Sequence, residues 1–183
     1  MRTHSLAGGL VVAVLAVIAA AAPAGAQGFS NAGDKDAGLA FTGDSFDEAY
    51  LRYYLNPRLG IQAGLGYTRS SSDADSIGAS SLDLRVGALY EICGGERHRG
   101  YVLPSLNYTS MDIGPVERSG FGFGLALGGD IKLTDHFMLG LEGGLRFQSF
   151  SDEFGDTDVN DGTAWSIGNT NRLNLTLRFP HDD

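Results

Sequence analysis

Apolar and polar residues alternate along much of the chain, which is the pattern of β-strands whose two faces lie in different surroundings. Between Leu59 and Thr68, apolar side chains occupy every second position, and Gly, Gln and Thr occupy the positions between them. Residues 120–133 and 137–147 repeat this pattern clearly, and other stretches repeat it more weakly. The alternation therefore predicts eight strands, at 37–43, 48–55, 59–68, 82–92, 101–109, 120–133, 137–147 and 165–179.

The connections between these stretches alternate between short and long. Asn56-Pro57-Arg58 and Thr134-Asp135-His136 are predicted tight turns, because Asn, Pro, Asp and Thr are common turn residues. The stretch 93–100 belongs with the short connections. The long connections lie at 43–47, 69–80, 110–119 and 148–164. An even number of strands, with short turns at one end and long loops at the other, is typical of a transmembrane β-barrel.

Alternation alone is compatible with two kinds of barrel: a membrane barrel with its apolar face outside, and a soluble lipocalin-like barrel with its apolar face inside. Composition favours the membrane barrel. The chain has 27 Gly, and the polar face of the predicted strands consists mostly of Gly, Ser, Thr and Gln with few charges. A water-exposed strand face gains nothing from Gly, whereas the interior of a narrow eight-stranded barrel needs small side chains.

Aromatic residues on the apolar face fall near the ends of the predicted strands. One set lies at the long-loop end: Tyr67, Tyr108, Phe121, Phe147 and Trp165. The other set lies at the short-turn end: Tyr53, Tyr90, Phe137 and Phe179. The stretch from Leu59 to Tyr67 spans about 26 Å of strand, or roughly 20 Å of height at a 40° tilt. Two aromatic girdles around an apolar band of this height are the pattern of an outer-membrane barrel.

The N-terminus has the three parts of a secretory signal peptide. Arg2 provides the positive charge of the n-region, residues 10–22 form the apolar h-region, and Ala24-Gly25-Ala26 is a small-residue cleavage site. The apolar run is too short to span a bilayer as a helix. We therefore expect residues 1–26 to be removed and residues 27–183 to form one barrel domain. Removal changes the formal net charge from −9 to −10, because it takes away one Arg and no acidic residue.

These features resemble the small outer-membrane β-barrel proteins of Gram-negative bacteria, the group that includes the OmpX-like barrels and the OmpA transmembrane domain. The resemblance covers residues 37–179. It rests on the alternation, on two segments that join a turn to a strand, Leu55–Gly60 and Leu133–Met138, and on the last strand, Leu173–Phe179. It implies an all-β, eight-stranded antiparallel up-and-down barrel in the outer membrane, with periplasmic termini. The last strand resembles the signal that the family presents to the barrel-assembly machinery.

Catalysis on lipid A, an activity of some eight-stranded outer-membrane proteins, needs catalytic residues at the long-loop end. A Ser–His–acid arrangement there requires a histidine to accept the serine proton. The four histidines lie instead in the leader, the short turns or the C-terminal tail: His4, His98, His136 and His181. We therefore expect a protein without catalytic activity or a cofactor. The single cysteine, Cys93, cannot form an intramolecular disulfide, and its role is left open.

One acidic loop has oxygen ligands at alternate positions, as Ca²⁺ prefers. Its candidate ligands are Asp156, Asp158, Asn160 and Asp161. The spacing departs from an EF-hand, because Asp161 stands where that motif needs Gly and Ile167 stands where it needs Glu. We therefore predict a solvated acidic loop here rather than a metal centre.

The polar face carries charged residues of both signs, which would meet inside the barrel. The acids are Glu48, Asp83, Glu91, Asp130 and Glu142, and the bases are Arg52, Arg85, Lys132, Arg146, Arg172 and Arg178. Because desolvated charges persist only when they are paired, we predict ion-pair networks across the lumen. Glu48 and Arg52, and Glu142 and Arg146, are candidate members. The networks would hold a packed, water-poor interior; alternatively, they would gate a narrow ion path.

The sequence thus favours a non-enzymatic outer-membrane barrel with a role in envelope integrity or surface interaction. Two alternatives remain: a small, low-conductance porin-like channel, and a soluble periplasmic barrel that binds an apolar ligand. Most of the negative charge falls in the predicted extracellular loops. We expect those loops to attract divalent cations or basic surface partners, and the monomeric barrel to contact outer-membrane lipid and lipopolysaccharide. The acidic chain is not suited to nucleic acid, which needs clustered Lys and Arg.

Overall fold

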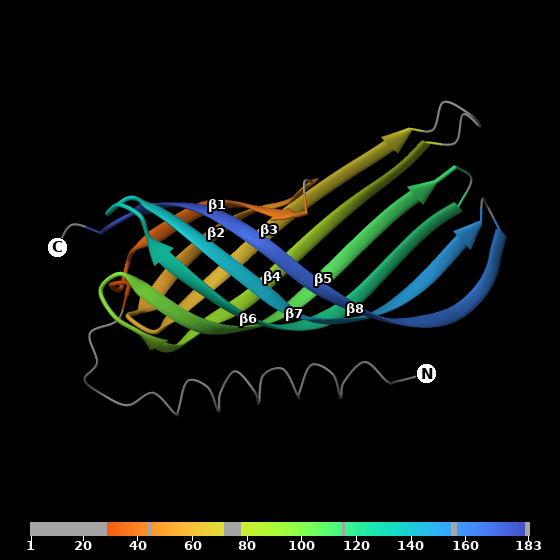
Figure 1. Cartoon of the computed structure of the whole chain (residues 1–183). Helices are drawn as coiled ribbons and strands as arrows, with labels where there is room; N and C mark the ends of the chain where they lie inside the picture. The colour runs from red at the N-terminus through yellow and green to blue at the C-terminus, as the bar shows by residue number, and fades with distance from the viewer. Residues whose placement is uncertain (1–28, 44, 72–77, 115, 155–156, 182–183) are drawn as a thin grey trace.

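The structure, a computed structural model, describes residues 29–43, 45–71, 78–114, 116–154 and 157–181, except the side chains of 70, 71, 152–154, 157–167 and 169. In this part of the chain, eight strands form a closed barrel (Figure 1). They are β1 (Lys35–Thr42), β2 (Ser45–Asn56), β3 (Leu59–Ser71), β4 (Gly78–Gly94), β5 (His98–Ile113), β6 (Val116–Lys132), β7 (Phe137–Phe154) and β8 (Thr157–Phe179). Each strand is antiparallel to the next, and β1 closes the barrel against β8. The predicted fold class is confirmed.

The strands are tilted across the barrel (Figure 1). Successive paired residues around the barrel are Gly38, Tyr50, Gly64, Arg85, Asn107, Gly122, Gln148 and Ser166. Ser166 lies ten residues before Thr176, which is the residue of β8 that pairs with Gly38. A stagger of this size in eight strands corresponds to a tilt of roughly 40°. The stagger decides which inward side chains, on different strands, lie at the same level of the interior.

The two ends of the barrel differ. The β2–β3, β4–β5 and β6–β7 turns and both ends of the described chain lie at one end, which we call the turn end. At the other end, the loop end, the strands extend into long hairpins (Figure 1). Asn56 closes the β2–β3 turn, because its Oδ1 accepts hydrogen bonds from the backbone N–H of Arg58 and of Leu59, at 2.9 Å each. Thr134 Oγ1 accepts in the same way from the N–H of Phe137, at 3.0 Å. Both predicted tight turns are therefore present.

Several strands are longer than the alternation predicted. β5 begins at His98 rather than 101 and ends at Ile113 rather than 109, and β7 and β8 extend through most of the predicted loop 148–164. Alternation is visible only where one strand face meets apolar surroundings, but the backbone ladder of a hairpin continues into polar sequence. The predicted strand ends were wrong for this reason.

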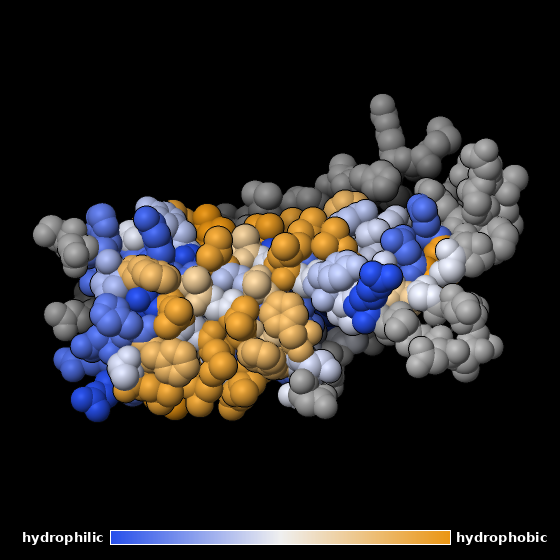
Figure 2. All heavy atoms as spheres, turned by 90° about the horizontal axis from the view of Figure 1, so that it is seen from above, coloured by the Kyte–Doolittle hydropathy of each residue, from blue (hydrophilic) through white to orange (hydrophobic). Residues whose placement is uncertain are grey.

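The barrel is apolar outside and polar inside. Leu51, Phe121 and Leu141 on the outer face are 65%, 72% and 67% exposed. Figure 2 shows an apolar band across the visible face, with hydrophilic residues on either side of it. Most of the buried side chains are polar or charged. This arrangement contradicts the soluble barrel with an apolar interior, which was one of the alternatives. No helix in the described residues is long and apolar enough to cross a membrane.

Glycine on the inner face makes room for large side chains from the neighbouring strand. Gly38 lies opposite Tyr50, and a Cβ at Gly38 would overlap the Tyr50 ring. Gly128 lies opposite Tyr101 in the same way. The barrel interior is thus filled by a few large residues that face glycine, rather than lined evenly by small ones. One buried apolar cluster lies among them, made of Tyr54, Leu89, Tyr101, Leu103 and Ala126.

Candidate functional site: the charged interior

Five charged residues meet in the half of the interior nearer the turn end. We call them the turn-end cluster: Asp36, Arg52, Arg99, Asp130 and Arg178. Asp130 Oδ2 lies 2.8 Å from Arg52 Nη1 and 2.5 Å from Arg99 Nη2. Asp36 lies 3.0 Å from Arg178 Nε and 3.4 Å from Arg99 Nη2. All five side chains are at most 3% exposed. Each carboxylate is shared by two guanidinium groups, which offsets the cost of burying these charges.

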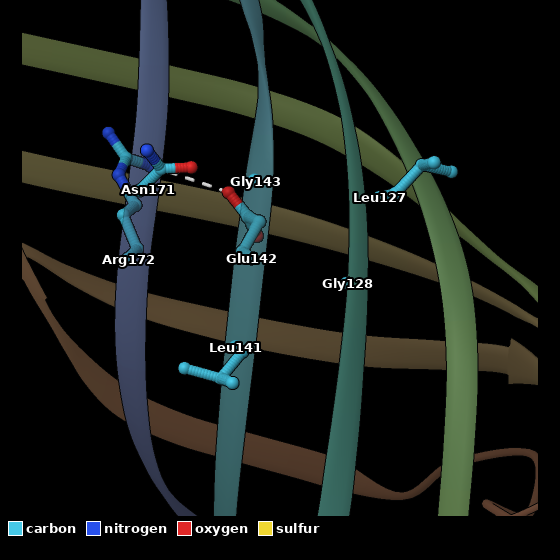
Figure 3. Close-up of a pocket in the computed structure, with 7 residues that line it drawn as sticks. All are labelled: Leu127, Gly128, Leu141, Glu142, Gly143, Asn171 and Arg172. Carbon is cyan, nitrogen blue, oxygen red and sulfur yellow. Dashed lines mark ion pairs between the residues drawn. The ribbon is translucent and has the colours of Figure 1, made fainter.

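A second group, the central cluster, lies farther toward the loop end and contains Asp47, Glu48, Arg85, Glu142 and Arg172. Arg85 bridges two acids, with Nη1 2.6 Å from Glu142 Oε1 and Nη2 2.8 Å from Glu48 Oε1. Arg172 Nη1 lies 3.3 Å from Glu48 Oε2 and 3.7 Å from Glu142 Oε1 (Figure 3). Arg172 also pairs with Asp47. Strands β2, β4, β7 and β8 are therefore joined across the lumen.

A third, smaller group lies nearest the loop end. Arg146 Nη2 lies 2.6 Å from Asp83 Oδ1, and Thr109 Oγ1 donates to the same carboxylate oxygen at 2.6 Å. These charges are more accessible than those of the other clusters, because Asp83 is 35% and Arg146 21% exposed. Solvent therefore screens this pair more than the deeper ones.

The pairs run between strands and not along them. Glu48 and Arg52 lie in different clusters, and so do Glu142 and Arg146. The Cα atoms of residues four apart on one strand are about 13 Å apart, so their side chains lie at different levels of the interior. The inward position of a charge follows from the alternation, whereas its partner is set by the stagger of the barrel.

Two of the predicted lumen charges lie near the N-terminal segment rather than in these clusters. Glu91 Oε2 accepts a hydrogen bond from the backbone N–H of Phe29 at 3.4 Å. Lys132 Nζ lies 4.5 Å from the centre of the Phe29 ring. Both residues are at the turn end, where they contact the chain that precedes β1.

The sequence prediction missed three charges that the structure places inside the barrel: Asp36, Asp47 and Arg99. Asp36 was left out because the first strand was predicted to begin at 37, and Arg99 because it fell in the predicted connection 93–100. The signal was available, because Arg99 lies two positions before the buried Tyr101 and therefore on the same face of the strand. Continuing the alternation past the last apolar residue would have found Asp36 and Arg99.

The predicted girdle residues lie on the outer surface where the structure describes them. Tyr53, Tyr67, Phe121 and Phe179 are exposed, and Tyr90, Tyr108, Phe137 and Phe147 are partly exposed. At the loop-end girdle, the rings of Tyr108 and Phe121 are 4.9 Å apart, and Phe147 stacks on Phe123 at 4.8 Å. Phe123 was not among the predicted girdle residues. The side chain of Trp165 lies outside the described residues.

The barrel wall has a shallow hollow beside the central cluster (Figure 3). Its lining is Leu127, Gly128, Leu141, Glu142, Gly143, Asn171 and Arg172. Gly143 lies between Leu127 on β6 and Asn171 on β8, so the hollow is where a wall residue lacks a side chain. The backbone ladder continues across it, since Gly143 is paired on both sides.

The described residues offer no arrangement for catalysis by a histidine or for metal binding. His98, His136 and His181 are exposed at the turn end, and His4 lies outside the described residues. No group of three or more His, Cys, Asp or Glu side chains in the described part could hold a metal ion. The candidate calcium ligands Asp156, Asp158, Asn160 and Asp161 lie outside the described side chains. Cys93 is an exposed free thiol.

Comparison with known proteins agrees with this architecture. Residues 10–177 match the family described as outer membrane protein beta-barrel domain. OprG, an outer membrane protein of Pseudomonas aeruginosa, superposes with a TM-score of 0.50 at 13% identity, covering 86% of this chain and 100% of that one. The N-terminal β-barrel domain of Pseudomonas aeruginosa OprF has a TM-score of 0.46 at 16% identity, covering 80% and 96%. At 13% identity, the similarity to OprG concerns the fold alone. No curated protein matches the sequence.

Proposed function

This chain belongs to the outer membrane protein beta-barrel domain family, and from that premise we propose that it is a closed, non-catalytic barrel that acts in envelope integrity or surface interaction. The observation that supports a blocked, non-conducting lumen is the packing of charged side chains inside the barrel. The turn-end and central clusters draw side chains from β1, β2, β4, β5, β6, β7 and β8 into the lumen. In an eight-stranded barrel, side chains can fill the interior completely.

A packed interior of this kind serves as a rigid support for the loop end. Surface-interaction sites of small barrels lie on loops, which need a scaffold that holds their ends in place. Ion pairs between strands brace that scaffold from within. The absence of a histidine on the described part of the inner face supports a role without catalysis.

We place the turn end in the periplasm and the loop end outside the cell, because outer-membrane barrels have short periplasmic turns and longer extracellular loops. This orientation suits export through a signal peptide at 1–26 and recognition of the last strand by the barrel-assembly machinery. It turns the acidic loops outward, where divalent cations would bridge them to lipopolysaccharide. The barrel itself would contact lipid as a monomer.

Planar-bilayer recording of the purified protein tests whether the lumen conducts ions. We expect no sustained conductance steps from the wild type. Arg146→Ala, which removes the most accessible lumen pair, should stay silent as well, because the two deeper clusters remain. Arg97→Ala, in the exposed β4–β5 turn, is the matched control. Sustained steps in the wild type whose size changes with Arg146→Ala but not with Arg97→Ala would establish the small pore instead.

The envelope role is tested in the producing cells. A strain that lacks the gene should take up a hydrophobic fluorescent dye faster than its parent, and the full-length gene should restore the parent's rate. Equal dye uptake, together with unchanged adhesion to surfaces and cells, would contradict this function. The bilayer result does not depend on that outcome.

A further inference from the structure

The six residues before β1, Phe29–Asp34, fold back into the turn end of the barrel. Phe29 and Ser30 are only 3% and 2% exposed, although they precede the first strand. In Figure 1 this segment starts the coloured chain at the same end of the barrel as the C-terminus. We call the six residues the clasp. Their burial at a barrel mouth, outside the strands, needs a physical explanation.

Three cations surround the aromatic ring of the clasp. Arg178 Cζ lies 4.7 Å, Arg99 Cζ 4.8 Å and Lys132 Nζ 4.5 Å from the centre of the Phe29 ring. A ring face attracts cations most strongly where water is excluded, and Arg99 and Arg178 are both buried. The ring therefore helps to stabilise three cations, from β5, β6 and the end of β8.

The backbone and the polar side chains of the clasp are held as firmly. Phe29 donates its N–H to Glu91, and its carbonyl accepts from Arg178 Nη1 at 2.8 Å. Ser30 Oγ accepts from Arg178 Nη2 at 2.8 Å and from Arg99 Nη1 at 3.1 Å. If this segment were mobile, the two guanidinium groups would lose these acceptors in a dry site, which is costly.

The other end of the clasp joins the first strands to the C-terminal tail. Gly33 donates its N–H to the carbonyl of Tyr54 at 2.8 Å, and Asp34 Oδ1 accepts from the N–H of His181 at 2.9 Å. Gly33 has φ of +89°, a conformation that favours glycine, and a Cβ there would lie 2.8 Å from the His181 ring. The two ends of the described chain are thus fastened to each other through the clasp.

The clasp contacts the seam where the barrel closes. β1 is the shortest strand, and it pairs with β8 through only seven residue pairs, Lys35–Phe41 with Phe179–Leu173. Arg178 of β8 spans this seam to Asp36 of β1 at 3.0 Å, and the same guanidinium group binds the Phe29 carbonyl and Ser30. One residue therefore joins the seam, the turn-end cluster and the clasp.

We propose that the clasp is a strap that seals the turn-end mouth of the barrel and holds the β1–β8 seam closed. Phe29 fills the mouth beneath the turn-end cluster, and Ser30 orders the two arginines that pair with Asp36. When the clasp is released, the mouth admits solvent to Arg99 and Arg178, and the short seam loses the ordering of its bridging arginine. This inference concerns closure of the barrel at one end and is independent of its role in the envelope.

Cysteine labelling of the folded full-length mature chain in detergent micelles tests the seal. In a Cys93→Ser background, Ser30→Cys places a thiol in the buried part of the clasp, and Ala32→Cys places one two residues away on its exposed part. A charged maleimide should react with the Ser30→Cys variant at least about tenfold more slowly than with the Ala32→Cys variant, because a buried thiol reacts only when the segment opens. Adding Phe29→Ala to both variants should abolish that difference. Equal rates for the two variants without Phe29→Ala would show that the clasp is not seated.

Hydrogen exchange followed by mass spectrometry tests the seam. With Phe29→Ala, exchange should become several-fold faster in peptides from Lys35–Phe41 and Leu173–Phe179. It should stay unchanged in peptides from Tyr108–Ile113 and Val116–Phe121, the loop-end parts of β5 and β6, which do not contact the clasp. Phe29→Leu keeps the bulk but removes the ring face, and should give an intermediate rate if the cations hold the clasp. Unchanged exchange at the seam would overturn the strap, and so would an equal increase in every strand. If a Phe29 variant does not fold, the comparison of Ser30→Cys with Ala32→Cys still decides whether the clasp is seated.

Discussion

Asp130 is the residue whose replacement tests most directly whether the buried charges hold the barrel together. Asp130→Asn preserves the shape of the side chain and one carbonyl acceptor but removes the negative charge. The carboxylate oxygen that lies 2.8 Å from Arg52 and 2.5 Å from Arg99 would become an amide atom. Arg52 would then lose its carboxylate partner in the turn-end cluster, whereas Arg99 would keep Asp36 at 3.4 Å.

The size of the effect follows from burial. Removing one partner of a fully buried ion pair typically destabilises a protein by about 3–5 kcal/mol, because the remaining charge stays desolvated. Asp130 and both arginines are 0% exposed, so solvent does not reduce this cost. The retained acceptor and the remaining Asp36 place the expected loss near the lower value, about 3 kcal/mol, or roughly a hundredfold in the unfolding equilibrium.

The matched control is Asp83→Asn, the same substitution in the loop-end pair. Asp83 is 35% exposed, so its pair with Arg146 is screened and its loss should cost less than about 1 kcal/mol. Urea titration in detergent micelles, followed by the gel mobility of unheated samples, measures the folded fraction of both variants. If Asp130→Asn proves no more destabilising than Asp83→Asn, the reasoning from burial is refuted.

Three further substitutions extend the test to other parts of the barrel. Leu141→Arg, on the apolar outer face, should lower the free energy of unfolding in lipid vesicles by about 2–4 kcal/mol, whereas Leu133→Arg, just beyond β6 at the turn end, should cost about 0–1 kcal/mol; equal costs would mean that the membrane band is misplaced. Gly128→Val forces a side chain into the Tyr101 ring and should cost about 1–3 kcal/mol by the same titration, with Gly78→Ala, which has open space around it, as a neutral control. Gly33→Ala should destabilise the folded protein by about 1 kcal/mol or more, since it combines a left-handed backbone with contact against His181, and a melting temperature equal to that of the wild type would contradict this role.

The side-chain orientation of the described residues within the predicted strands could be predicted from the sequence. Alternation is a local property, because successive side chains of a strand point to opposite faces. The polarity of each face can therefore be read from every second residue. Glu48, Arg52, Asp130 and Glu142 were placed inside for this reason. The tight turns were equally local, because Asn56 and Thr134 bond to backbone groups within three residues.

The partners of those charges were beyond the reach of the sequence. Arg52 meets Asp130, 78 positions away, because of the stagger between strands, and no local pattern records that stagger. The predicted strands ended too early where the backbone ladder continues into polar residues. Asp36 and Arg99 lie in these extensions and were therefore missed. The clasp was not foreseen at all, since Phe29 and Ser30 lie outside every alternating stretch.

The sequence by itself therefore determined which side chains share a face of each strand, because that depends only on residue polarity at a period of two. The glycine-rich composition of the polar face then favoured its placement in the lumen. The tertiary structure alone decided which charges pair, where the hairpins end and how the N-terminal segment closes the mouth. Those features depend on closure of the barrel, which brings β1 against β8 and sets residues from distant strands at one level.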